Sequence, residues 1–368
     1  MSKLSKALTS FDVARLAGVS QSAVSRTFTP GASVSELTQR KVLEAARRLG
    51  YRPNAHARSL ITKRSRIIGL VLSYLENLFY PVALQKLAQR LQRDGYHVLL
   101  FVSDGDDADE LVAQILQYHV DGIILAATTL SSGLARECAS ASIPVVLFNR
   151  VVADSKSALS SVRSDNVEGG RLVADYLIQT KHQRIAYIAG SEETSTNLER
   201  ERGFRERLEE SGMRIWARGV GNYDFDQARL AVKKMCVKGQ EMPDAIFVAS
   251  DHMAFGVMDT LRSELGLRVP QDVSVIGFDN VPQAAWDSYQ LTTVEQPVEA
   301  MVEATVNLLQ NYLRSDQVPA SEHVVVPVRL LLRGSVKNLA SIESIDVKQT
   351  VNKAVNKLTK TRVTRAAQ

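Results

Sequence analysis

The chain has 368 residues, of which 45% are hydrophobic and 23% are charged, and its formal net charge is +5. This composition excludes global disorder and a membrane-embedded bundle, and the length predicts two or three domains. The charge is uneven: residues 1–66 hold 13 Lys and Arg against 3 Asp and Glu, whereas residues 67–334 hold 25 against 35. A basic head on an acidic body favours contact between the head and a polyanion, with a solvated basic segment as the alternative.

The basic head, residues 9–50, predicts three short helices, the second over 21–28. Each follows a hydroxyl side chain that can cap it, and the first and third end at a glycine. The caps are Thr9 or Ser10, Ser20 and Ser35, and the glycines are Gly18 and Gly50. The apolar side chains expected to face inward are Phe11, Val13, Ala14, Leu16, Ala17, Val24, Phe28, Val42, Ala45, Ala46 and Leu49.

The turn Ala17-Gly18-Val19 joins the first two helices into a helix-turn-helix, whose second helix enters the major groove of DNA. Its polar side chains can hydrogen-bond base edges, and an arginine can contact guanine with two bonds. They are Gln21, Ser22, Ser25 and Arg26. The other basic side chains suit phosphate contacts, namely Arg15, Arg40, Lys41, Arg47 and Arg48. A small helical protein-binding domain is the alternative.

From residue 67 onward, short apolar runs alternate with amphipathic helical stretches. The apolar runs are 67–72, 97–102, 122–126, 144–148, 185–189, 245–249 and 273–277. The helical stretches are 81–94, 107–118, 168–180, 198–211, 226–238, 253–265 and 298–313. This alternation predicts parallel sheets covered on both faces, and about 270 residues are enough for two α/β lobes. Ligands of such sheets bind beyond the carboxyl ends of the strands, here between the lobes.

No catalytic or metal-binding pattern stands out in the sequence. The motifs GxSxG, HExxH and GxxxxGK[ST] are absent, and the six histidines lack metal-ligand spacing. Cys138 and Cys236 are isolated, which suits a reducing compartment. No apolar leader with a small-residue cleavage site precedes the head. We therefore expect a cytoplasmic protein that is not an enzyme, with no catalytic residue, metal or cofactor and no membrane contact.

The combined motifs resemble one protein family. FDVARLAGVSQSAVSR followed by VSELTQRKVLEAARRLGYRPNAHARSL is similar to the DNA-binding head and hinge of the LacI/GalR family of bacterial transcriptional repressors. The resemblance continues through IGLVLS, VDGIILA, DNVEGGRLVADYLI, RIAYIAG, RERGF, ASDHMAFGVMD, LRVPQDVSVIGFDN and LTTVEQP. It covers about residues 8–334.

The resemblance implies an α/β protein with a three-helix helix-turn-helix head (1–52), a hinge helix and linker (53–66), and a two-lobed periplasmic-binding-protein-like body with parallel sheets (67–334). The first lobe would comprise about 67–164 plus a return near 296–324. The second would comprise about 165–292 plus a last strand near 325–334. The tail, 335–368, carries Val347, Val351, Val355 and Leu358 at helical spacing. It is expected to be a disordered basic segment, with a short helix that adds a tetramer contact as the alternative.

On the DNA side, the resemblance implies contacts by Thr9, Ser20, Gln21, Ser22, Ser25, Arg26, Thr29, Asn54, Ala57, Arg58 and Leu60. The two hinge helices of a dimer would order on specific DNA and insert Leu60 into a minor-groove step. Ordinary linker packing is the alternative for Leu60. The family commonly has a larger apolar residue at Ser10, an asparagine at Thr29 and a basic residue at Ile61. These departures leave the operator sequence open.

On the effector side, residues that follow predicted strands are the candidates, and Arg200 and Asp279 match the family's effector-binding arginine and carboxylate. Asn77 also follows the first strand. The candidate set is Phe79, Tyr80, Thr128, Thr196, Arg200, Phe225, Ser250 and Asp279. The structural alternatives are core packing for the aromatic rings and capping for the carboxylates. For Asp165, a capping turn is the preferred interpretation.

Together these features predict a homodimeric, sequence-specific transcriptional regulator, most simply a repressor. A small polar, sugar-like metabolite bound between the lobes would control its affinity for operator DNA. A tetramer is possible. One alternative is a solute-binding protein of a transport system, which would need an export signal and would have no use for residues 1–66. Another is an enzyme acting on a sugar or nucleotide, which would need a nucleophile–base pair.

Overall fold

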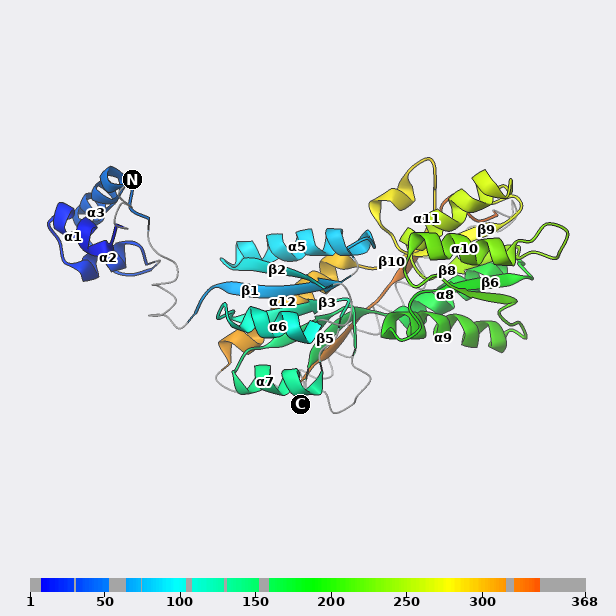
Figure 1. Ribbon diagram of the computed structural model, residues 1–368, viewed down its shortest axis with the longest axis horizontal. Helices are drawn as coiled ribbons and strands as arrows, with labels where there is room; N and C mark the ends of the chain where they lie inside the picture. The colour runs from blue at the N-terminus through cyan, green and yellow to red at the C-terminus, as the bar shows by residue number, and fades with distance from the viewer. Residues whose placement is uncertain are drawn as a thin grey trace, which may run out of the picture.

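The computed structural model describes residues 8–29, 31–52, 64–73, 75–103, 108–128, 131–151, 159–315 and 321–337. The head and the two lobes of the body are separate bodies in Figure 1. The head contains three helices, α1 (Ser10–Ala17), α2 (Gln21–Thr27) and α3 (Glu36–Leu49). Within the described residues, no helix is both long and apolar enough to span a membrane.

Local side-chain chemistry sets the ends of the head helices as predicted. Thr9 precedes α1, and its backbone N donates to Asp12 Oδ2 at 3.0 Å. Ser20 and Ser35 cap α2 and α3 by accepting a hydrogen bond from a backbone N of the first turn. The glycines that end α1 and α3 have φ values of 66° and 70°, which favour a residue without a Cβ atom.

The core of the head is smaller than the sequence predicted. Its buried side chains are Val13, Ala14, Val24, Val42, Ala45 and Ala46. Phe11 is 65% exposed and Leu16 is 49% exposed, so the prediction that they face inward was wrong. At ~100° per residue, these two side chains flank the buried stripe of α1 on opposite sides. Three short helices cover only the centre of that stripe.

The first lobe is a six-stranded parallel sheet with the order β11-β5-β4-β3-β1-β2. The strands are β1 (Ile67–Ser73), β2 (His97–Ser103), β3 (Gly122–Ala126), β4 (Val145–Phe148), β5 (Ser160–Ser164) and β11 (His323–Val326). Its helices are α5 (Phe79–Arg93), α6 (Ala108–Leu116), α7 (Ser132–Ser140) and α12 (Val298–Arg314).

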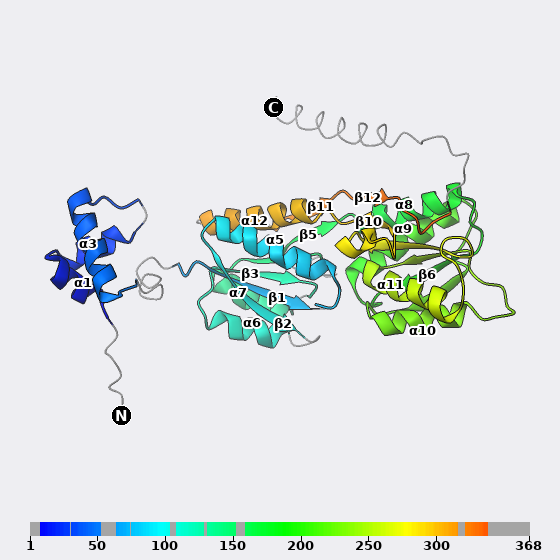
Figure 2. The same ribbon diagram turned by 90° about the horizontal axis from the view of Figure 1, so that it is seen from above.

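Alternate strand residues bury opposite faces of this sheet, as the pleat requires. Leu70 packs in the same cluster as Leu87 of α5, whereas Val71 packs with Val112 of α6. In Figure 2, α5 and α12 lie on one side of the sheet and α6 lies on the other, and Cys138 of α7 packs in the same cluster as Val112 of α6. Figure 2 shows α5 beside α12, where Lys86 and Arg90 pair with Glu299 and Glu303.

The second lobe repeats the strand order as β12-β10-β9-β8-β6-β7, with β12 antiparallel to β10. The strands are β6 (Ile185–Ala189), β7 (Ala217–Val220), β8 (Ala245–Val248), β9 (Ser274–Asp279), β10 (Thr292–Glu295) and β12 (Arg329–Leu331). The helices are α8 (Asn166–Gln179), α9 (Ser195–Glu210), α10 (Phe225–Met235) and α11 (Asp251–Asp259). A π-helical turn, Thr260–Glu264, continues α11, and a 3₁₀ turn covers Pro282–Ala285. The predicted α/β fold with parallel-dominated sheets is confirmed.

The chain passes between the two sheets three times, after β5, after β10 and after β11. Strand β5 itself was missed by the hydrophobic pattern because it reads Ser-Ser-Val-Arg-Ser, yet its serines are buried. Their hydroxyls have partners: Ser160 bonds the Tyr312 hydroxyl at 2.8 Å, and Ser164 donates to Gln296 Oε1 at 2.7 Å. A polar strand can therefore occupy the interior next to the crossings.

Candidate functional site

The second helix of the head presents one polar, exposed face. Ala23 and Val24 point into the core, and the predicted base-reading residues Gln21, Ser22, Ser25 and Arg26 are all exposed. Gln21 Nε2 donates to Ser10 Oγ at 3.2 Å. The exposed face of α2 therefore offers hydrogen-bond donors, acceptors and one cation of the kind that can bond base edges in a DNA groove.

The remaining predicted contacts in the head divide into three groups. Thr9 and Ser20 are the caps of α1 and α2, and the exposed Thr29 donates its hydroxyl to the Ser25 carbonyl at 2.8 Å. Arg15, Arg40 and Arg48 are exposed and paired with acidic neighbours on their own helices. Asn54, Ala57, Arg58 and Leu60 lie outside the described residues.

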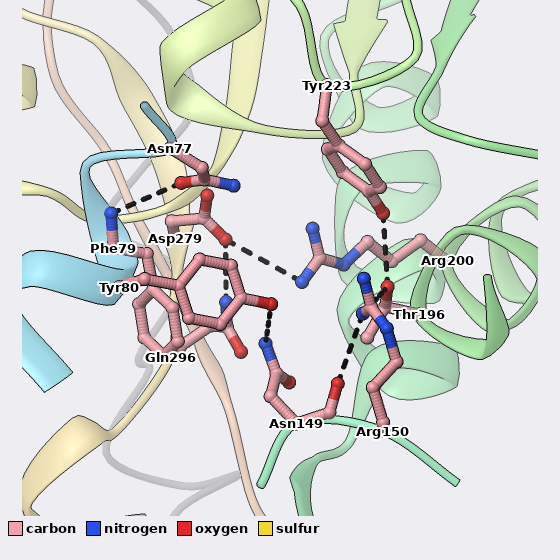
Figure 3. A pocket seen from close by; sticks show the side chains of 10 residues that line it. All are labelled: Asn77, Phe79, Tyr80, Asn149, Arg150, Thr196, Arg200, Tyr223, Asp279 and Gln296. Carbon is pink, nitrogen blue, oxygen red and sulfur yellow. Dashed lines mark hydrogen bonds and ion pairs between the residues drawn. The ribbon is translucent and has the colours of Figure 1, made fainter. Parts of the chain in front are cut away.

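A pocket between the lobes gathers ten side chains from the carboxyl ends of the strands and the segments that follow them (Figure 3). The first lobe contributes Asn77, Phe79, Tyr80, Asn149 and Arg150, and the second contributes Thr196, Arg200, Tyr223 and Asp279. Gln296 lies where the chain crosses after β10. Both lobes are therefore needed to complete the pocket.

Four groups surround the Arg200 guanidinium. Its Nε donates to Asn166 Oδ1 at 2.9 Å, an Nη1 hydrogen bond reaches the Ala249 carbonyl, and its Cζ lies 3.7 Å from the centre of the Phe278 ring. Nη2 lies 3.6 Å from Asp279 Oδ1, and both side chains are almost fully buried. Two neutral acceptors, a ring and a carboxylate thus fix the guanidinium plane.

Close packing of α8 on α9 brings Arg200 to this position. A Cβ atom on Gly170 would lie 2.2 Å from the Arg200 carbonyl oxygen, and one on Gly203 would lie 2.0 Å from the Val167 carbonyl oxygen. Only glycine lets the two backbones approach this closely. Gly170 of DNVEGGRLVADYLI therefore serves the packing of the two helices, whereas Gly169 leaves room for the Phe278 ring, which would lie 2.6 Å from a Cβ there.

Asp279 ends β9 with a φ of 132°, a conformation that side-chain-bearing residues rarely adopt. Gln296 Nε2 donates to its Oδ1 at 2.6 Å, while Oδ2 has no partner among the described residues. Burial raises the pKa of Asp279 even though Arg200 is nearby. The desolvation of a fully buried carboxyl outweighs one guanidinium at 3.6 Å.

Asp251 supports the loop that carries Asp279. It accepts hydrogen bonds from Val281 N at 2.9 Å and from Thr293 Oγ1 at 2.6 Å. Gly277 leaves room for it, since a Cβ there would lie 2.2 Å from Asp251 Oδ1. Burial, and then the nearby Asp279, raise the pKa of Asp251. Asp251 is thus a buried structural carboxyl, and Asp165 is the cap of α8, as predicted.

The other wall is aromatic and amide-rich. The Phe79 and Tyr80 rings meet edge to face at 5.3 Å, and Asn149 Nδ2 approaches the Tyr80 hydroxyl at 3.4 Å. Across the pocket, Thr196 Oγ1 contacts the Tyr223 hydroxyl at 3.1 Å. The cavity between the walls is only about 10 Å³, roughly the space that one water molecule needs. A wider cleft of about 420 Å³ adjoins it and shares Asn77 and Tyr223.

Five of the eight predicted effector residues line this pocket, namely Phe79, Tyr80, Thr196, Arg200 and Asp279. The other three do not. Ser250 caps α11 by accepting from Met253 N. Phe225 begins α10 and contacts the His252 ring, and Thr128 follows β3 without lining the pocket.

The remaining pocket residues are Asn77, which the sequence analysis noted without placing it in the candidate set, and Asn149, Arg150, Tyr223 and Gln296, which it missed. Asn149 and Arg150 directly follow β4, and Gln296 follows β10, so the strand-end rule could have found them. Tyr223 was missed because Phe225 was chosen from the same loop. Asn222 and Tyr223 have φ values of 52° and 59°, and this left-handed turn directs Tyr223 to the pocket.

Comparison with known proteins identifies the chain. Residues 11–54 match the bacterial regulatory proteins of the lacI family, and residues 174–336 match the periplasmic binding protein-like domain. Catabolite control protein A of Priestia megaterium is 33% identical over 335 residues, which is 90% of this chain and 99% of that protein. The chain belongs to the lacI family. As a member of that family, it is a DNA-binding transcriptional regulator.

Other lacI-family proteins are similar to this chain over comparable lengths. The transcriptional regulator CelR of Thermobifida fusca is 32% identical, over 87% of this chain and 94% of CelR. A Lac repressor dimer bound to operator and an anti-inducer covers 90% of this chain and all of its own, at 27% identity with a TM-score of 0.80. A CelR–cellobiose complex covers 89% and 99% at 30% identity, with a TM-score of 0.67.

Proposed function

We propose that this lacI-family protein is a homodimeric repressor whose affinity for operator DNA is set by a small polar metabolite in the pocket between the lobes. The observation that carries this proposal is the composition of the pocket: neither lobe alone supplies the side chains that line it. A bound ligand therefore interacts with both lobes and stabilises one arrangement of them over another.

The size of the cavity supports a coupling between binding and lobe movement. About 10 Å³ is far too little for a sugar, since ligand sites commonly enclose ~300 Å³ or more. Entry therefore requires the walls to separate or their side chains to move. The adjoining cleft of about 420 Å³ provides an approach past Tyr223.

Movement of the first lobe can reach the DNA-binding head. The backbone N atoms of Ser65 and Arg66 donate to the Asp121 carboxylate at 2.7 and 3.0 Å, and Arg64 donates to the Leu313 carbonyl at 2.7 Å. The chain that leaves the head is thus fastened to the first lobe just before β1. In a dimer, a change in the spacing of the first lobes would change the spacing of the heads.

Each part of the chain has one role in this mechanism. Residues 1–52 would read half-sites through α2, and residues 53–66 would read the minor groove at the centre through Leu60. Residues 67–334 would bind the effector and dimerise, and residues 335–368 would form the basic tail. The Lac repressor structure that resembles this chain is a dimer on operator DNA, and CelR is bound to cellobiose. We extend those partners to this chain, place it in the cytoplasm, and assign it no catalytic step and no cofactor.

The test is a fluorescence-anisotropy titration of the full chain against DNA fragments taken from beside its own gene, with coding fragments of equal length as the control. We expect a preference for one or more upstream fragments and a change in affinity when the metabolite is added. Arg26→Ala should reduce the preference, whereas Lys41→Ala should weaken binding to all fragments equally. Equal binding to every fragment, with or without small molecules, contradicts the proposal.

A further inference from the structure

Arg150 is the side chain of the pocket that its surroundings explain least. It follows β4, is 5% exposed, and its Nη1 donates to the Asn149 carbonyl at 3.1 Å and to Thr196 Oγ1 at 2.8 Å. Both acceptors are neutral. Its Nε and Nη2 make no hydrogen bond with the described part of the chain, and no carboxylate there lies within ion-pair distance.

Two other part-buried arginines of the body have carboxylate partners, whereas Arg184 and Arg333, which are more exposed than Arg150, bond neutral acceptors among the described residues. Arg207 lies 2.6 Å from Asp175, and Arg163 lies 3.3 Å from Glu199. A buried guanidinium without such a partner destabilises the fold, because it loses its hydration and gains no ion pair. The position of Arg150 is therefore costly to the empty protein and is best explained by a partner that arrives from outside.

The charge of the pocket also supports a partner that arrives from outside. Its ten lining residues include two arginines and one carboxylate, and the other seven are uncharged. The Arg200–Asp279 contact of 3.6 Å accounts for one cation and the one anion. The remaining positive charge is that of Arg150. Burial also raises the pKa of Asp279, which weakens the one negative charge among the described lining residues.

The two arginines meet at one part of the pocket wall. Thr196 and Arg200 are four residues apart on α9 and lie on the same face of that helix. Arg150 contacts Thr196, so its guanidinium reaches the wall that Arg200 occupies (Figure 3). The amide and carboxyl side chains Asn77, Gln296 and Asp279 lie opposite and can bond hydroxyl groups.

We propose that the effector of this pocket carries an anionic oxygen group, a carboxylate or a phosphate ester on a hydroxylated metabolite, and that Arg150 binds it. This inference rests on the proposed function of the pocket. A planar guanidinium matches the oxygens of either group with two parallel hydrogen bonds. Arg150 thus selects an acidic metabolite over its neutral parent.

The experiment compares neutral sugars with their acidic derivatives on the full-length protein. The probes are D-glucose, D-gluconate and D-glucose 6-phosphate, D-galactose and D-galacturonate, and inorganic phosphate, all at constant ionic strength. Binding is measured by calorimetry and by the shift in Tm. The two acid classes distinguish a carboxylate from a phosphate, and we expect at least one acidic compound to bind tenfold or more tightly than its neutral parent.

Two variants test the role of Arg150. Arg150→Met should lose the preference for the acid, yet its Tm without ligand should equal or exceed that of the wild type, because an uncompensated charge has been removed. Arg207→Met is the matched control: it breaks a compensated pair, so its Tm should fall while the preference for the acid remains. A structural role for Arg150 would instead lower the Tm of Arg150→Met.

Asn149→Asp provides a second test if Arg150→Met does not fold. It keeps the shape of the side chain and adds a negative charge to the pocket wall next to the Tyr80 hydroxyl, so it should weaken the binding of acids selectively. Neutral sugars that bind as tightly as their acids, or a preference that survives in Arg150→Met, would overturn the anion inference and leave metabolite control intact. The absence of any response to the acids and to phosphate would also overturn it. Loss of operator preference would contradict the proposed function instead.

Discussion

The two lobes share one strand order but hold their pocket residues in different ways. In the second lobe, Arg200 and Asp279 are tied into a buried network that includes Asn166, Phe278 and Gln296. In the first lobe, the Asn149–Tyr80 contact is 3.4 Å long, and Asn149 Oδ1 has no described partner. Among the described residues, the second lobe thus holds its two charged side chains in place and leaves Asp279 Oδ2 open, whereas the first lobe holds the Asn149 amide and the Tyr80 hydroxyl only by a long contact.

This difference predicts different roles for the two walls of the pocket. A preorganised wall contributes affinity without rearranging, because its ordering cost is met during folding. The less constrained wall can adjust as the lobes close. We therefore expect substitutions in the second-lobe wall to affect folding stability and binding together, and substitutions in the first-lobe wall to affect binding alone.

The strongest test of this contrast is Arg200→Met. It removes the partner of Asp279 and leaves Asn166 Oδ1 and the Ala249 carbonyl without their donor. Breaking a buried charge pair from one side typically destabilises a protein by about 3–5 kcal/mol. Urea denaturation should show a loss of that order, and the effector response should disappear. A variant of normal stability would show that the network is not preorganised.

A second test addresses the packing that positions Arg200. Gly203→Ala would place a methyl group 2.0 Å from the Val167 carbonyl, so α8 and α9 would have to separate. Such overpacking destabilises by about 1–3 kcal/mol. Gly133→Ala, in α7 of the first lobe, is the control, since the nearest atom to its added Cβ is Ser131 Oγ at 3.6 Å. We expect that variant to be neutral or slightly more stable in urea.

Asp279→Asn should weaken effector binding by about 1–3 kcal/mol, the usual effect of losing a charged hydrogen bond. Calorimetry with an identified effector measures this directly. The amide can still accept the hydrogen bond from Gln296, so the fold should persist. Affinity equal to that of the wild type would remove Asp279 from the binding site.

Asp279 also predicts a dependence of stability on pH. Burial raises its pKa, so the native carboxyl holds its proton more tightly than the carboxyl of the unfolded chain. This contribution to stability is present below the ordinary pKa of about 3.8 and is lost as the pH rises through the raised value. Denaturation at a series of pH values should show a smaller decline in Asp279→Asn. A decline of unchanged size would assign the effect to Asp251, whose pKa is raised as well.

The smallest effect is expected in the first lobe, for Tyr80→Phe. Among the described residues, the hydroxyl lost by this change takes part only in the long contact from Asn149. We expect the free energy of unfolding to change by less than about 0.5 kcal/mol, while effector affinity falls measurably. A large loss of stability would show that the first-lobe wall is as preorganised as the second.

Individual residues show which parts of the pocket and of the fold could be predicted from the sequence. Strand ends located Asn77 and Asp279, because a buried apolar run followed by a polar residue is a local pattern. The same rule applied to Phe148-Asn149-Arg150 would have found two more pocket residues. Tyr223 could not be distinguished from Phe225 in this way, since the choice depends on two left-handed backbone angles in the loop. Strand β5 carried no hydrophobic signal at all.

The sequence by itself determined the helix caps of the head, the alternation of strands and helices, and the family to which the chain belongs. These depend on neighbours within a few residues or on motif order, so local chemistry is sufficient. Only the tertiary structure decided which ten side chains meet between the lobes and which of them lack a partner. Arg150 and Thr196 are 46 positions apart in the chain, and their contact exists only because two sheets with the same strand order face each other across the pocket.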